Sequence, residues 1–127
     1  MNGLRTPEKR ALGLGSAKSG TGHFIAQRVT AVALALALLY AVFVLVGAVG
    51  QDYAGVRALV ARPTNAAVLI ALVIALFWHA ALGLQVVIED YVHSAGNAVV
   101  AQLLMRFACA FAAIVAVLAI LRIALGS

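Results

Sequence analysis

One histidine lies deep inside a long apolar stretch, and an Asp-Tyr pair follows the end of that stretch. No formally charged residue occurs from Pro63 to Ile88, and His79 lies within this run. A helix needs about 20 residues to cross ~30 Å of hydrocarbon, so a helix over this run places His79 at bilayer depth. Ionisable side chains at that depth are costly and face the protein interior. For a histidine there we expect a metal partner, and in a membrane helix bundle we expect haem iron.

Helical geometry puts a glycine and a carboxylate on the face of this histidine. Gly83 and Asp90 lie within ~40° of His79 around the helix axis. A glycine one turn from an axial ligand leaves room for a flat macrocycle, because it has no Cβ. It equally favours close approach of a neighbouring helix, and the sequence leaves both readings open.

A single histidine supplies only one axial position on a haem iron. The other histidines, His23 and His93, lie outside the charge-free run that holds His79. A second ligand must therefore come from another chain, or the site is not a haem. The alternative is that His79 only bonds a neighbouring helix.

Three further residues belong to the inner membrane surface. Arg28 precedes the first apolar run, where a guanidinium suits haem propionates or serves only as a topology arginine. Tyr91 can donate a hydrogen bond to a quinone carbonyl, and Asp90 beside it can pass protons. Both lie ~16–18 Å along the axis from His79. Their alternative is an interfacial tyrosine beside a loop.

The composition indicates an integral membrane protein built only of helices. Of the 127 residues, 65% are hydrophobic and 10% are charged, against about 25% charged in soluble proteins. The basic residues that precede the first apolar run are Arg5, Lys9, Arg10, Lys18 and Arg28. They are typical of a cytoplasmic N-terminus and lack the aromatic interleaving of a nucleic-acid site, so we expect membrane lipid and no nucleic acid as a partner.

The apolar runs predict a single membrane domain, residues 1–127, with three spanning helices. The first run is longer than the roughly 7–15 residues of a signal-peptide core, so we expect it to stay in the protein. Closely spaced glycines argue against a helix before it. Three spans put the C-terminus on the outer, periplasmic side. The expected elements are a cytoplasmic tail at 1–28, helices at about 29–51, 65–88 and 99–125, and loops at 52–64 and 89–97.

Two segments resemble a known family. Residues 79–93, HAALGLQVVIEDYVH, resemble the hydrophobic membrane-anchor subunit of succinate dehydrogenase, respiratory complex II. Residues 13–30, GLGSAKSGTGHFIAQRVT, resemble the tail of its alphaproteobacterial branch. The specific feature is a histidine followed eleven residues later by Asp-Tyr.

The resemblance implies a partner and a cofactor. Such an anchor packs with a second three-helix subunit, the cytochrome b chain, and the two hold one haem b with one axial histidine from each. His79 matches that ligand, and Arg28 matches an arginine near the propionates. Tyr91 matches a tyrosine that hydrogen-bonds ubiquinone, and Asp90 matches its acidic neighbour.

The resemblance also implies a role in electron transport and the tricarboxylic acid cycle. The chain would dock the flavoprotein and iron–sulfur subunits of a succinate:ubiquinone oxidoreductase at a bacterial inner membrane. It would not be catalytic alone. Two alternatives stay open: a menaquinol-dependent fumarate reductase anchor, and a small structural or transport membrane subunit without haem.

Overall fold

Four helices make up the part of the chain that the computed structural model describes, residues 18–126. In chain order they are α2 (Lys18–Ala48), α3 (Tyr53–Ala61), α4 (Pro63–Tyr91) and α5 (Ala95–Ala124). Within α2 from Gly20 onward, and over the whole of α4 and α5, the chain is long and apolar enough to cross a membrane. The expected all-helical class with three spanning helices is confirmed.

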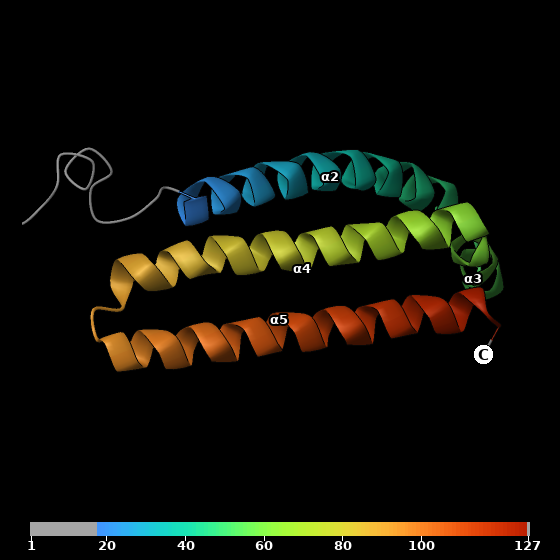
Figure 1. Ribbon diagram of the computed structural model, residues 1–127. Helices are drawn as coiled ribbons and strands as arrows, with labels where there is room; N and C mark the ends of the chain where they lie inside the picture. The colour runs from blue at the N-terminus through green and yellow to red at the C-terminus, as the bar shows by residue number, and fades with distance from the viewer. Residues whose placement is uncertain (1–17, 127) are drawn as a thin grey trace, which may run out of the picture.

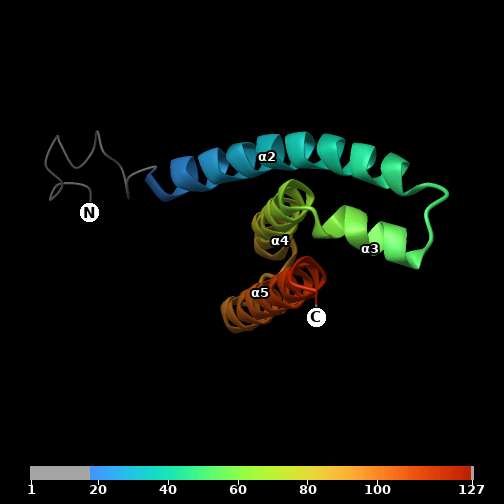
Figure 2. The same ribbon diagram turned by 90° about the vertical axis from the view of Figure 1, so that its right-hand side faces the viewer.

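The three long helices form a row with α4 in the middle. In residues 18–126, α4 packs against both α2 and α5, but α2 and α5 do not contact each other. Figures 1 and 2 show α2 passing obliquely over α4, while α4 and α5 run side by side in opposite directions. The end of α4 therefore lies at the same end of the molecule as the beginnings of α2 and α5. The short α3 contacts all three long helices at the opposite end.

The first helix begins earlier than the sequence predicts. It starts at Lys18 instead of residue 29, and Gly20 and Gly22 are helical. A glycine costs a helix only about 1 kcal/mol, and packing of α2 on α4 outweighs that cost. The helix ends at Ala48, before the predicted residue 51, because Gly50 adopts a left-handed conformation with φ of 78°. Residues 1–17 of the expected tail lie outside the described residues.

The predicted loop at 52–64 is wrong, because it contains α3 and the beginning of α4. The side chain of Asp52 accepts a hydrogen bond from the Gly55 backbone N–H at 2.8 Å and so caps α3. Pro63 stands at the first turn of α4, where its missing N–H costs no helical hydrogen bond. Only Arg62 separates the two helices.

The two later helices also extend further than predicted toward the turn that joins them. The sequence predicts that the second spanning helix ends at residue 88, but α4 continues to Tyr91. The third helix begins at Ala95 and ends at Ala124, against a prediction of 99–125. As a result, Asp90 and Tyr91 belong to the last turn of α4 instead of the loop.

Small residues dominate the little buried surface that the chain has. The buried hydrophobic side chains are Ala41, Val44, Ala66 and Ala75, and no large side chain in the described part is fully buried. Alanines let α2 and α4 approach closely, as is typical of helix contacts in lipid. The large apolar side chains point outward instead, so the row of helices needs lipid or further protein on its faces.

A buried asparagine ties three helices together at the α3 end. Asn65 is 6% exposed. Its Oδ1 accepts a hydrogen bond from the Tyr40 hydroxyl at 2.8 Å, and its Nδ2 donates to the Leu59 carbonyl at 2.7 Å. Polar groups buried away from water are costly unless paired, so this side chain fixes how α2, α3 and α4 meet.

We predict that Asn65→Ala destabilises the protein by about 1–3 kcal/mol, because the Tyr40 hydroxyl and the Leu59 carbonyl lose their partner. Thermal unfolding of the detergent-extracted protein measures this loss. The control is Asn97→Ala, since Asn97 is exposed at the beginning of α5 and its loss should cost less than about 0.5 kcal/mol. Equal effects of the two substitutions would contradict the role of Asn65 in joining the three helices.

Candidate functional site

The imidazole of His79 is held against α2 by a threonine. His79 lies in α4 and is half-buried, and its Nδ1 is 3.0 Å from the Oγ1 of Thr30. Thr30 is 4% exposed, which makes it one of two buried polar side chains in residues 20–126. Thr30 is not among the residues predicted from the sequence. The two residues are 49 positions apart on different helices, and no periodic pattern pairs them.

Arg28 and His79 line the same hollow. The hollow has a volume of ≈ 260 Å³ and is also lined by Phe24, Gln27 and Ala31. The Arg28 guanidinium lies over the Phe24 ring, 5.0 Å from its centroid. Arg28 does not precede the first helix as predicted; it lies about three turns inside α2. A cation and an imidazole therefore converge on one space beside α2 and α4.

The glycine one turn after His79 faces open space. A Cβ added at Gly83 would meet no atom of another element within 4 Å. Close packing of α2 or α5 in this chain is therefore not what requires a glycine there. Because Gly83 lies within ~40° of His79 around the axis of α4, the opening is on the side of the imidazole. It leaves room for a group from outside the chain.

Asp90 and Tyr91 form a separate place at the end of α4. Both are exposed, Tyr91 by 77%, and neither side chain makes a hydrogen bond within residues 18–126. Tyr91 is ~18 Å along the helix axis from His79. The structure therefore does not bring the Asp-Tyr pair and the histidine together. It places them at two levels of one helix: His79 is well inside α4, and the Asp-Tyr pair is in its last turn. That end of α4 lies beside the beginnings of α2 and α5 (Figure 1).

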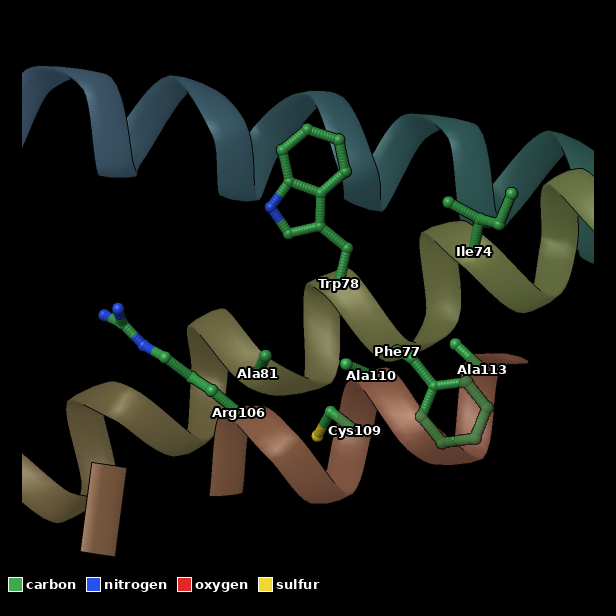
Figure 3. Close-up of a pocket in the computed structure, with 8 residues that line it drawn as sticks. All are labelled: Ile74, Phe77, Trp78, Ala81, Arg106, Cys109, Ala110 and Ala113. Carbon is green, nitrogen blue, oxygen red and sulfur yellow. The ribbon is translucent and has the colours of Figure 1, made fainter. Parts of the chain in front are cut away.

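A second hollow lies between α4 and α5. Its volume is ≈ 240 Å³, and Figure 3 shows its lining: Ile74, Phe77, Trp78, Ala81, Arg106, Cys109, Ala110 and Ala113. Arg106 extends along α4 and donates to the Gln85 side chain at 3.2 Å, and Gln85 donates to Glu89 at 2.9 Å. The rest of this lining is alkyl, aromatic or thiol, so the hollow lacks the imidazole–cation pair found beside α2.

The other two histidines do not line the hollow that His79 lines. His23 lies on α2, about two turns before Thr30. It lines a third hollow with Gly20, Gln85, Val86 and Glu89. His93 is exposed in the turn after α4. In the described residues, no group of three or more His, Cys, Asp or Glu side chains is placed to hold a metal ion. A metal at His79 would take its other donors from outside these residues.

Comparison with known proteins identifies the family of this chain. Residues 2–121 match the family described as succinate dehydrogenase/fumarate reductase transmembrane subunit. Two similar proteins are each named succinate dehydrogenase hydrophobic membrane anchor subunit. The one from Rickettsia bellii is 40% identical over 83 residues, which is 65% of this chain and 66% of that protein. The one from Paracoccus denitrificans is 37% identical over 86 residues, 68% of this chain and 67% of that protein.

The aligned part of this chain thus spans about two thirds of the length of these relatives. No solved structure shows significant similarity to it. The family match nonetheless covers nearly the whole sequence, including all three membrane-spanning helices apart from the last residues of α5. The chain is therefore a multi-pass membrane protein that belongs to the succinate dehydrogenase/fumarate reductase transmembrane subunit family.

Proposed function

We propose that this chain is the membrane anchor of a succinate:ubiquinone oxidoreductase and that it ligates haem b through His79. It docks the flavoprotein and iron–sulfur subunits at the cytoplasmic face of a bacterial inner membrane and pairs with a cytochrome b subunit. The names of the relatives support the anchor role. The haem and quinone roles rest on the arrangement of this chain's own residues.

The observation that carries the haem role is the way His79 is held. Its Nδ1 is engaged by Thr30, so Nε2 is the ring nitrogen left to bind a metal. A neutral imidazole is a common metal ligand. Arg28, on the same hollow, offers a guanidinium that pairs well with carboxylates such as haem propionates. One nitrogen donor, one cation and an open glycine face are what a shared haem needs from half of its site.

The row of helices suits a site completed by another chain. The space beside Gly83 is not filled by α2 or α5. A helix of the cytochrome b subunit would close that face and bring the second axial histidine. When bound, the haem supplies one-electron transfer, and this chain orients it through His79, Arg28 and Gly83.

The end of α4 supports a role in binding ubiquinone. The exposed Tyr91 hydroxyl is free to donate a hydrogen bond to a quinone carbonyl, and Asp90 is positioned to pass protons from the cytoplasmic side. Hydrogen bonds to an oxygen that gains charge during reduction contribute most to rate. The partner subunits form the rest of that pocket.

Two other functions are tested against this one. A structural or transport subunit without haem would also use a His79–Thr30 hydrogen bond to join two helices, but it gives no reason for the cation on the same hollow. A visible spectrum of the purified complex separates these, since only a haem subunit shows reduced b-type bands. The family model also includes fumarate reductases, and the quinone pool of the organism, ubiquinone or menaquinone, separates these two enzymes.

We predict that His79→Ala removes the low-spin b-haem spectrum of the assembled complex, because no other histidine of the described chain lines this hollow. The measurement is the reduced-minus-oxidised visible spectrum of membranes with equal amounts of the complex. His93→Ala is the matched control and should keep the spectrum, since His93 is exposed in a turn. An unchanged low-spin spectrum in His79→Ala would rule out axial ligation.

We predict that Gly83→Val lowers haem content while the subunit still inserts into the membrane, because a Cβ at Gly83 meets no other element of residues 18–126 but enters the proposed haem face. Haem is measured per complex by its pyridine spectrum. Gly96→Val is the control, since a Cβ at Gly96 also meets nothing and α5 holds it away from His79. Wild-type haem content in Gly83→Val would show that the open space serves another purpose.

We predict that Tyr91→Phe slows ubiquinone reduction by about 10-fold or more, since a hydrogen bond to a charged oxygen contributes about 1.5–3 kcal/mol. Succinate oxidation with an artificial acceptor should not change. Asp90→Asn should slow the same step and leave haem content intact. Tyr53→Phe is the control, because Tyr53 is 78% exposed at the opposite end. If Tyr91→Phe reduces ubiquinone at the wild-type rate, Tyr91 is only an interfacial residue.

A further inference from the structure

The hydroxyl of Thr30 lies close to three polar atoms where α2 crosses α4. Its Oγ1 lies 2.8 Å from the Ala26 carbonyl, 3.1 Å from the Gln27 carbonyl and 3.0 Å from Nδ1 of His79. Thr30 is 4% exposed. Each of these contacts is therefore shielded from competing water. Which atom donates and which accepts in each of them follows from the hydrogen atoms that the groups carry.

The two carbonyls accept hydrogen bonds and cannot donate them, and a hydroxyl has one hydrogen. That hydrogen goes toward Ala26, with Gln27 as the more distant acceptor. The remaining contact is favourable only if Thr30 Oγ1 accepts and His79 Nδ1 donates. With the opposite direction, the hydroxyl lone pairs would face both carbonyl oxygens. The imidazole is therefore protonated at Nδ1, and Nε2 carries the lone pair.

His79 depends on this hydrogen bond more than Thr30 does. Threonine in an apolar helix commonly satisfies its hydroxyl by bonding the carbonyl four residues earlier, as Thr30 does with Ala26. Thr30 would be satisfied without His79. The Nδ1–H of His79, in contrast, has no other hydrogen-bond partner within residues 18–126. The stability of α2 alone therefore does not explain why this hydroxyl lies opposite Nδ1.

We propose that Thr30 is a positioning residue for the haem ligand: its hydroxyl fixes the Nδ1–H tautomer and the ring plane of His79 and thereby lowers the midpoint potential of the haem. This inference rests on the proposed function. A hydrogen bond from the second nitrogen of a ligating imidazole makes the ligand more basic, which stabilises the oxidised iron. Because the Thr30 hydroxyl donates a hydrogen bond to the Ala26 carbonyl, its oxygen is a stronger acceptor than that of an isolated hydroxyl.

The test compares Thr30→Val with Thr30→Ser in the assembled complex. Valine keeps the branched shape and loses the hydroxyl, whereas serine keeps the hydroxyl. The readouts are the haem midpoint potential, from a redox titration of the visible spectrum, and the g values of the ferric haem by electron paramagnetic resonance. We expect Thr30→Val to shift the potential to more positive values and to change the g values. Thr30→Ser and the control Thr64→Val, at the exposed beginning of α4, should match wild type.

A wild-type potential and wild-type g values in Thr30→Val would overturn the proposal. If Thr30→Val does not assemble, Thr30→Ala is measured by the same criteria. Failure of both to assemble would also overturn it, because the hydroxyl would then serve helix packing. The His79→Ala spectrum keeps the two ideas apart. If His79→Ala retains low-spin haem, the proposed function fails. If His79→Ala loses the haem and Thr30→Val is unchanged, only the role of Thr30 fails.

Discussion

The hydrogen bond between Thr30 and His79 is the contact on which the site depends. In hydrocarbon an unpaired polar group is costly, so the imidazole is held where α2 crosses α4. The two helices also pack through small side chains, since Ala41 of α2 and Ala66 and Ala75 of α4 are buried. Once α2 lies there, Arg28 reaches the hollow that His79 also lines. The position of a cation beside an imidazole thus follows from one helix crossing.

The second constraint is the open row of helices. Since α2 and α5 do not touch in the described part of the chain, part of the surface of α4 stays uncovered, and Gly83 lies on that part. A closed three-helix bundle would bury that surface and exclude an external group. In the proposed haem site the row supplies one nitrogen ligand and a partner subunit supplies the other, so assembly of the two subunits and cofactor binding are expected to be coupled.

Much of the fold could be predicted from charge-free runs, because a membrane span requires them. The same runs placed His79 well inside the second spanning helix and Asp90 and Tyr91 near its end, as the structure has them. The early beginning of α2 could not be predicted, since glycine propensity pointed the other way and tertiary packing outweighed it. The cap of α3 was readable in Asp52 but was missed. The contact of Thr30 with His79 could not be predicted, because hydrophobic periodicity describes one helix and does not say which residues of two helices meet.

The most direct test of the central claim is chemical rescue of the ligand. Replacing His79 with glycine removes the imidazole and leaves space at the same position. We predict that the assembled His79→Gly complex lacks the low-spin b-haem spectrum and that added imidazole restores it, because the free ligand replaces the lost Nε2. A low-spin spectrum in His79→Gly without imidazole would contradict axial ligation by this chain.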